Sequence, residues 1–187
     1  MMTLALPHLD RLAYRLAQII AYLRPARTTA VMPPAFAAML PPDAICAFDA
    51  LAASDRAHLI AVATELRARG SSDELVIAGL LHDIGKLPSK FQSLALTQRV
   101  AKVALTAIAP SLLVRIATRP TPPRGMSGLW AYANHARIGA GIARDAGCDE
   151  RVCWLIAHHE DTEVTDPELR LLIAIDDSRS VIPGGAR

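Results

Sequence analysis

The chain has 187 residues and a formal net charge of +2, and 52% of its residues are hydrophobic. It contains 34 alanines but only 8 aromatic residues, and alanine favours helices whereas aromatic residues favour strands. This composition excludes an all-β sandwich or barrel, and high hydrophobicity with low net charge excludes a disordered chain. The near-neutral charge indicates no specific nucleic-acid partner. The sequence therefore predicts one all-α domain, with or without a small appendage.

The three cysteines, Cys46, Cys148 and Cys153, have the spacing neither of a disulfide framework nor of a zinc ribbon. Sparse cysteine is typical of a reducing compartment, so we expect a cytoplasmic protein. The N-terminus lacks the basic start and apolar stretch of a signal peptide. No apolar run reaches the roughly 18–20 residues of a membrane span, so we expect no transmembrane segment.

Helical periodicity begins near the N-terminus. Apolar residues spaced by three and four predict an amphipathic helix over residues 9–24, which ends before Pro25. Five prolines over residues 25–42 predict an irregular connection with a short helix near residues 35–40. The first part of the chain is therefore expected to be a helical extension.

Two helices are expected next. One covers residues 54–69 with Ser54 as its N-cap. The other covers residues 71–84, where Ser71 and Glu74 form a capping box. A glycine follows the end of each helix, as is typical of helix C-termini: Gly70 and Gly85.

The second half of the chain is expected to hold five more helices. Their predicted ranges are 92–109, 111–118, 129–146, 150–160 and 167–178. A loop rich in proline and glycine separates the second of these helices from the third. The strongest start signal is Asp166 as N-cap, followed by Pro167 at the first helical position.

Histidines and aspartates interrupt the apolar faces of five predicted helices. These residues are His58, His82, Asp83, His135, His158, His159 and Asp176. A buried histidine or carboxylate is costly unless it is paired, hydrogen-bonded or metal-bound. Helical bundles build metal sites by projecting one such residue inward from each of several facing helices. Imidazole and carboxylate ligands suit iron, manganese, zinc, cobalt or nickel, so the sequence predicts a divalent transition metal.

Each residue also has a purely structural interpretation. A lone histidine on an apolar face is more often a core or capping residue than a ligand. His8 is expected at the surface, and Asp161 and Asp177 are expected to be solvated. The order and surroundings of the whole set favour a site over separate structural roles.

The segment Ala-Gly-Leu-Leu-His-Asp-Ile-Gly-Lys at residues 78–86 resembles the signature of the HD superfamily of metal-dependent phosphohydrolases. The family order is a histidine, a His-Asp doublet and a distal aspartate, which His58, His82, Asp83 and Asp176 match. A two-metal subgroup has two further histidines before the final aspartate. His135 matches the first, and either His158 or His159 matches the second, His159 slightly better. The resemblance covers residues 54–178.

The resemblance implies an HD-domain-like helical bundle. Residues 51–180 would be the metal-binding domain. Residues 1–50, which carry none of the resemblance, are expected to be an N-terminal helical extension, and residues 181–187 a flexible tail. One ion would be held by His58, His82, Asp83 and Asp176, and Asp83 would bridge to a second ion completed by His135 and His159. A metal-activated water would attack phosphorus.

Two basic residues are candidates for binding a substrate phosphate. Lys86 follows the doublet at a turn, and Arg137 is a weaker candidate two residues after His135. A solvated lysine near a helix C-terminus is an equally simple interpretation of Lys86.

The chain also departs from parts of the family. It lacks the Gly-Tyr-Pro segment that follows the double histidine in the cyclic-di-GMP-hydrolysing branch, and no synthetase segment is attached. We therefore expect a small stand-alone member that hydrolyses a phosphomonoester or phosphodiester, with nucleotides among the candidates. Two alternatives stay open, a di-iron oxygenase of the same superfamily and a non-enzymatic regulatory or binding module. The apolar region at residues 100–116 is core or a subunit interface, which leaves a homo-oligomer open.

Overall fold

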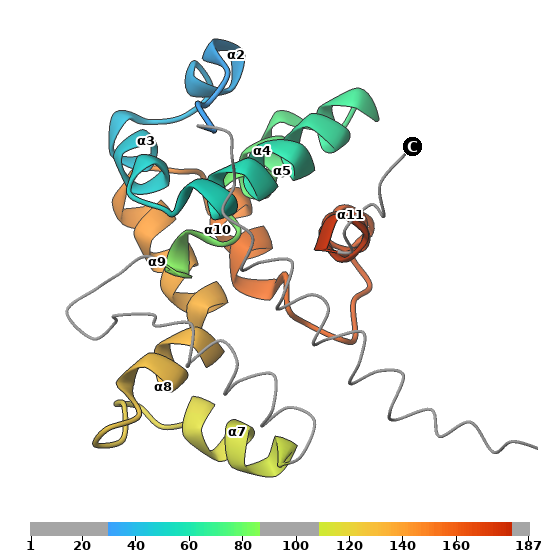
Figure 1. Ribbon diagram of the computed structural model, residues 1–187. Helices are drawn as coiled ribbons and strands as arrows, with labels where there is room; N and C mark the ends of the chain where they lie inside the picture. Colours follow the sequence, from blue (N-terminus) through green and yellow to red (C-terminus); the bar gives the residue numbers. More distant parts are fainter. Residues whose placement is uncertain (1–29, 87–108, 181–187) are drawn as a thin grey trace, which may run out of the picture.

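The computed structural model describes residues 30–86 and 109–180, and all regular secondary structure within these ranges is helical (Figure 1). In chain order the elements are α2 (Pro34–Ala37), α3 (Pro42–Asp49), α4 (Ala53–Ala68), α5 (Asp73–Leu81), the 3-10 turn η1 (Ile84–Lys86), α7 (Pro110–Ala117), α8 (Ser127–Ala133), α9 (His135–Asp145), α10 (Glu150–His158) and α11 (Pro167–Ser180). The predicted all-α fold is confirmed. The expected helices at residues 9–24 and 92–109, His8 and the tail lie outside the described residues.

Helices α4, α5, α9, α10 and α11 make up the centre of the fold. Helix α5 packs against both α4 and α10, α9 packs against α10 and η1, and α11 packs against α4 and α5 (Figure 1). Leu66, Leu81 and Leu155 are fully buried among these helices. Phe36 and Phe48 from α2 and α3 belong to the same core, so the core continues across residue 50.

Two helix starts differ from the sequence prediction. Helix α5 is capped by Ser72, whose Oγ accepts a hydrogen bond from the backbone N–H of Leu75 at 3.2 Å. The predicted capping box at Ser71 is wrong, because the Ser71 hydroxyl is buried and has no hydrogen-bond partner within the described residues. Helix α4 begins one residue before Ser54, after Ala52, so Ser54 is not its N-cap.

Within the described residues, prolines begin several of the helices. The connection expected over residues 25–42 contains α2, close to the short helix predicted near residues 35–40, whereas α3, in which Pro42 is the first helical residue, is not predicted. Proline suits this position because its missing N–H would have no partner there and its fixed φ fits the helix. At α11 the prediction is confirmed, since Asp166 Oδ1 accepts from the Leu169 N–H at 2.9 Å and Pro167 follows it.

The helix predicted over residues 129–146 is two helices, broken at Asn134. The backbone of Asn134 has φ −112° and ψ 13°, outside the helical range. Its side-chain amide donates to the carbonyl of Ala117 at 3.1 Å and to the carbonyl of Trp130 at 2.9 Å. These bonds tie the end of α7 to the break, which places His135 at the first residue of α9.

Two further expectations concern cysteine and membranes. Cys46, Cys148 and Cys153 are all free thiols, as their spacing predicts. Within the described ranges, no helix combines the length and apolarity that a membrane span requires.

Candidate metal centre

The site is assembled from helix ends and from two helix interiors. His82 and Asp83 follow α5, His135 begins α9 and His159 follows α10. His58 lies within α4 and Asp176 within α11. Residues up to 118 positions apart in the sequence therefore meet between the helices.

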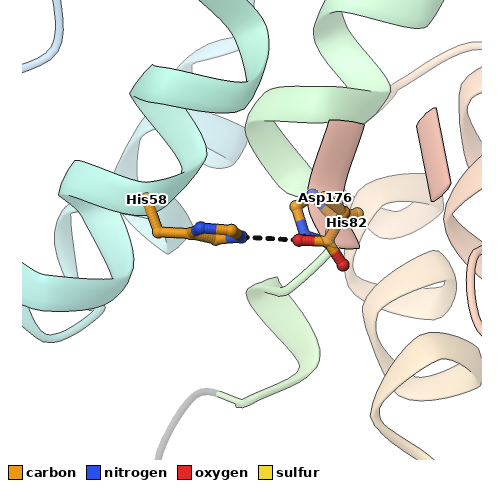
Figure 2. A group of neighbouring side chains, drawn as sticks. All are labelled: His58, His82 and Asp176. Carbon is orange, nitrogen blue, oxygen red and sulfur yellow. Dashed lines mark hydrogen bonds and ion pairs between the residues drawn. The ribbon is translucent and has the colours of Figure 1, made fainter. Parts of the chain in front are cut away.

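His58, His82 and Asp176 form a first group. Figure 2 shows the His58 imidazole pointing from its helix toward the Asp176 carboxylate. His58 Nε2 lies 2.7 Å from Asp176 Oδ1, and His82 Nε2 lies 3.4 Å from the same oxygen. One potential ligand atom from each of the three residues lies within 4.8 Å of the other two.

Asp83, His135 and His159 form a second group. Asp83 Oδ1 lies 3.2 Å from His135 Nε2 and 3.8 Å from His159 Nε2. The two imidazole Nε2 atoms are 3.2 Å apart. A nitrogen from each histidine and one carboxylate oxygen therefore face a common point.

The Asp83 carboxylate lies between the two groups. Its other oxygen, Oδ2, lies 3.8 Å from His82 Nε2 and accepts a hydrogen bond from Lys86 Nζ at 2.5 Å. Both oxygens of Asp83 are thus directed at basic side chains, Oδ1 at one group and Oδ2 at the other. Asp83 therefore lies near members of both groups.

Backbone carbonyls orient three of the histidines. The Nδ1 atoms of His82, His135 and His159 each lie 2.8–3.1 Å from the carbonyl oxygen of the residue three positions earlier. These carbonyls belong to the last turns of α5, α8 and α10, where no later helical N–H is available to them. A neutral imidazole has one N–H, so donation from Nδ1 assigns the lone pair to Nε2, which faces the site.

The buried charges stabilise one another. Burial opposes ionisation of Asp83, but Lys86 and His82 hold the pKa of its carboxyl well below the usual value. Burial likewise opposes ionisation of Asp176, yet His82 lowers the pKa of that carboxyl too. Burial, together with the neighbouring His82 and His135, lowers the pKa of His159 to about 4. At neutral pH the site therefore holds two carboxylates and a neutral His159.

His82 supplies a direct test of whether a metal fits. Its Nε2 atom is fully buried and has no hydrogen-bond partner within residues 30–86 and 109–180. Burial lowers the pKa of His82, but the carboxylates of Asp83 and Asp176 outweigh burial and raise it. In either protonation state a buried polar atom without a partner is costly. A divalent cation would use this nitrogen together with the nearby carboxylate oxygens, so the donor set fits a transition metal.

Gly85 allows the close approach that brings Asp83 to His135. A Cβ atom on residue 85 would overlap the carbonyl oxygen of His135 and would lie 2.7 Å from the backbone nitrogen of Gly139. The turn η1 and helix α9 therefore pack backbone to backbone. The prediction that Gly85 is the glycine that ends a helix is wrong, because α5 ends at Leu81 and Gly85 lies in η1. Steric contact with α9 explains the glycine.

Two predicted site residues lie outside this cluster. His158 is half-buried with a side chain that is 40% exposed, and its Nδ1 lies 2.7 Å from Asp161 Oδ2. Arg137 is exposed on α9, and its guanidinium donates to Asn134 Oδ1 at 3.2 Å. Of the two adjacent histidines, the structure therefore brings His159 to the cluster.

Two neighbours of His135 were not identified from the sequence. The Tyr132 ring stacks on the His135 ring, and Glu160 Oε2 lies 3.6 Å from His135 Nδ1. Glu160 directly follows His159, so its position in the sequence offered a signal. Tyr132 offered none, because the helix break at Asn134 creates its contact with His135.

The fold and the cluster together define an all-α domain with histidines and aspartates gathered between its helices. A sequence model of the HD domain matches residues 49–179, well over half of the chain. The chain therefore belongs to the HD domain family, whose members bind divalent metals. No curated protein and no solved structure matches the chain.

Proposed function

We propose that this protein is a metal-dependent phosphohydrolase that acts on a phosphomonoester or phosphodiester, with nucleotides among the candidate substrates. The observation that carries the proposal is the buried Asp83 carboxylate, which has histidine nitrogens near each of its oxygens. Membership of a family composed largely of metal-dependent phosphohydrolases supports it.

The two groups of side chains would hold one or two ions. His58, His82 and Asp176, with Asp83, would form the first set of ligands, and Asp83, His135 and His159 would form the second. Nitrogen and carboxylate donors suit iron, manganese, zinc, cobalt or nickel. When bound, such ions lower the pKa of water toward neutrality and neutralise negative charge on phosphoryl oxygens.

The chain's own residues prepare the site for this chemistry. The two low-pKa carboxylates, Asp83 and Asp176, supply negative charge for cations at neutral pH. Hydrogen bonds from the Nδ1 atoms fix the imidazole rings, so the Nε2 lone pairs need no reorientation. Both features are built into the fold before any ligand arrives.

Lys86 is the residue that we propose contacts the substrate phosphate. Its ammonium group has three N–H donors, of which Asp83 Oδ2 occupies one. The side chain is 14% exposed, so the ammonium lies at the edge of the buried cluster. Arg137 has no comparable position, because it lies about 200° around α9 from His135 and is exposed beside Asn134.

The test is an activity screen on protein purified without chelator. Wild type, Asp83→Ala and His158→Ala are each supplied with Mn²⁺ and offered a panel of phosphomonoesters and phosphodiesters. We expect wild type and His158→Ala to hydrolyse at least one phosphomonoester or phosphodiester of the panel, and Asp83→Ala to hydrolyse none. Equal cleavage by wild type and Asp83→Ala would contradict the proposed reaction. Metal-dependent oxygen consumption without ester cleavage would favour the oxygenase alternative.

A further inference from the structure

Tyr132 is a half-buried aromatic residue near the end of α8 that contacts two members of the site. Its ring is stacked on the His135 imidazole, with centroids 5.6 Å apart and an angle of 28° between the planes. The histidine–histidine contacts of the cluster are edge-on instead, with angles of 66–76°. Tyr132 therefore supports His135 across a ring face.

The backbone of Tyr132 acts on the same histidine. Its carbonyl oxygen accepts the hydrogen bond from His135 Nδ1 at 2.8 Å. A single hydrogen bond leaves an imidazole free to tilt about the bond, whereas a ring stacked on its face restricts that tilt. One residue thus fixes both the tautomer and the plane of His135.

The ring also contacts Lys86. The Lys86 ammonium lies 5.7 Å from the centroid of the Tyr132 ring, within the range of a cation–π interaction. The same ammonium hydrogen-bonds to Asp83 Oδ2, while His135 Nε2 lies 3.2 Å from Asp83 Oδ1. The Tyr132 ring therefore contacts the side chain nearest to each of the two oxygens of Asp83.

We propose that the aromatic ring of Tyr132 is a positioning element that holds His135 and Lys86 at the two oxygens of Asp83. The inference rests on the proposed function only in that Asp83 and His135 bind metal. Both contacts use the ring and not the hydroxyl, so a phenylalanine at this position should hold His135 and Lys86 equally well. An aliphatic side chain should not, because it offers neither a stacking face nor a π-system.

The test measures Mn²⁺ affinity calorimetrically on protein stripped of metal by chelator. Tyr132→Leu is expected to bind Mn²⁺ on the order of tenfold more weakly, the lower end of the cost of losing an outer-shell partner. Tyr132→Phe is expected to bind within about twofold of wild type. The visible absorption of bound Co²⁺ should change in Tyr132→Leu and stay unchanged in Tyr132→Phe, because it reports on the histidine ligands.

Trp130→Leu is the matched control. Trp130 lies two residues earlier on α8, about 200° around the helix, where its Nε1 donates to the carbonyl of Arg119 at 2.9 Å. Its replacement removes an aromatic ring from the same helix but not from the site. Mn²⁺ affinity within about twofold of wild type is expected for this variant.

Several outcomes would overturn the inference. A Tyr132→Leu variant that binds Mn²⁺ as tightly as wild type would show that the ring has no positioning role. Weakened Mn²⁺ binding in Tyr132→Phe would show that the hydroxyl, not the ring, is responsible. Equal weakening in Trp130→Leu would show a general effect of α8. If Tyr132→Leu does not fold, Tyr132→Met takes its place, and if both unfold while Trp130→Leu folds, Tyr132 is structural. A wild-type protein without Mn²⁺ or Co²⁺ binding would overturn the proposed function as well.

Discussion

The Nε2 atoms of His135 and His159 lie 3.2 Å apart at the centre of the cluster. Each ring places its Nδ1 at 2.8 Å from a backbone carbonyl, so in neutral rings the two facing nitrogens both carry lone pairs. Asp83 Oδ1 adds a third acceptor, 3.2 Å from one nitrogen and 3.8 Å from the other. In that state three acceptors would face one another and repel, and a bound cation would be coordinated by all three.

The adjacent histidines of α10 provide the sharpest test of this geometry. His159→Ala removes a buried nitrogen from the cluster, and we expect phosphate release to fall by more than about 100-fold, beyond the usual cost of losing an outer-shell partner. His158→Ala changes a half-buried residue outside the cluster and should leave the rate within about twofold. Steady-state phosphate release measures both effects.

This pair of variants controls for its own side effects. Both are histidine-to-alanine changes at neighbouring positions, so an effect of composition or of the helix end should appear in both. Equal loss of activity in the two variants would contradict the placement of His159 in the site.

Lys86 is predicted to act on the substrate rather than on the metal. In Lys86→Gln the Asp83 carboxylate keeps its histidine neighbours, so metal stoichiometry should stay unchanged. The loss of a charged donor to the phosphate should lower kcat/KM by at least about tenfold, since hydrogen bonds to charged groups contribute about 1.5–3 kcal/mol. Unchanged kcat/KM with a metal-loaded variant would show that Lys86 is only the partner of Asp83.

Gly85 and Gly141 should respond oppositely to alanine. Gly85→Ala places a Cβ against the backbone of α9, so we expect destabilisation of about 1–3 kcal/mol and weaker metal binding. Gly141 lies within α9 with open space around its Cβ position, so Gly141→Ala should stabilise the helix by roughly 0.5–1 kcal/mol. Urea unfolding measures both free energies. An unchanged free energy of unfolding in Gly85→Ala would contradict the tight contact between η1 and α9.

The start of α11, the helix that carries Asp176, should show a pH dependence at Asp166. The Leu169 N–H, and then the Arg151 guanidinium 2.9 Å away, lower the pKa of the Asp166 carboxyl below its usual value of 3.8. A lowered folded-state pKa stabilises the fold above pH 3.8, and this contribution is lost as the pH falls through the folded-state value.

Two variants separate the cap from the charge. Asp166→Asn keeps a capping side chain and loses the carboxylate charge, so its Tm should be slightly below wild type at pH 7 and equal to it once the pH is below the folded-state pKa of Asp166. Asp166→Ala loses the cap and should be less stable than Asp166→Asn at both values. A Tm difference between wild type and Asp166→Asn that grows on acidification would contradict the assignment.

The sequence predicted the kind of fold and the chemistry of the cluster because both depend on local patterns. Helical spacing and the Asp166-Pro167 pair predicted that α11 begins at Pro167, as it does. The His82-Asp83 doublet interrupts an apolar segment, and isolated polar residues there indicated a site.

Long-range contacts determined the features that the sequence did not predict. The break at Asn134 depends on hydrogen bonds to Ala117 and Trp130, and no local pattern contains the first of these. The choice between His158 and His159 depends on which side of α10 faces α9. The role of Tyr132 appears only once the break turns its ring toward His135.

Metal content is the most direct measurement of the central claim. Wild type and Asp83→Ala are purified without chelator and analysed for transition metals by mass spectrometry, before and after incubation with Mn²⁺, Fe²⁺, Co²⁺, Ni²⁺ or Zn²⁺. We predict at least about one equivalent of a divalent transition metal in wild type and much less in Asp83→Ala, since imidazole and carboxylate groups are the expected ligands. A folded wild-type protein that neither carries nor takes up any of these metals would contradict the account.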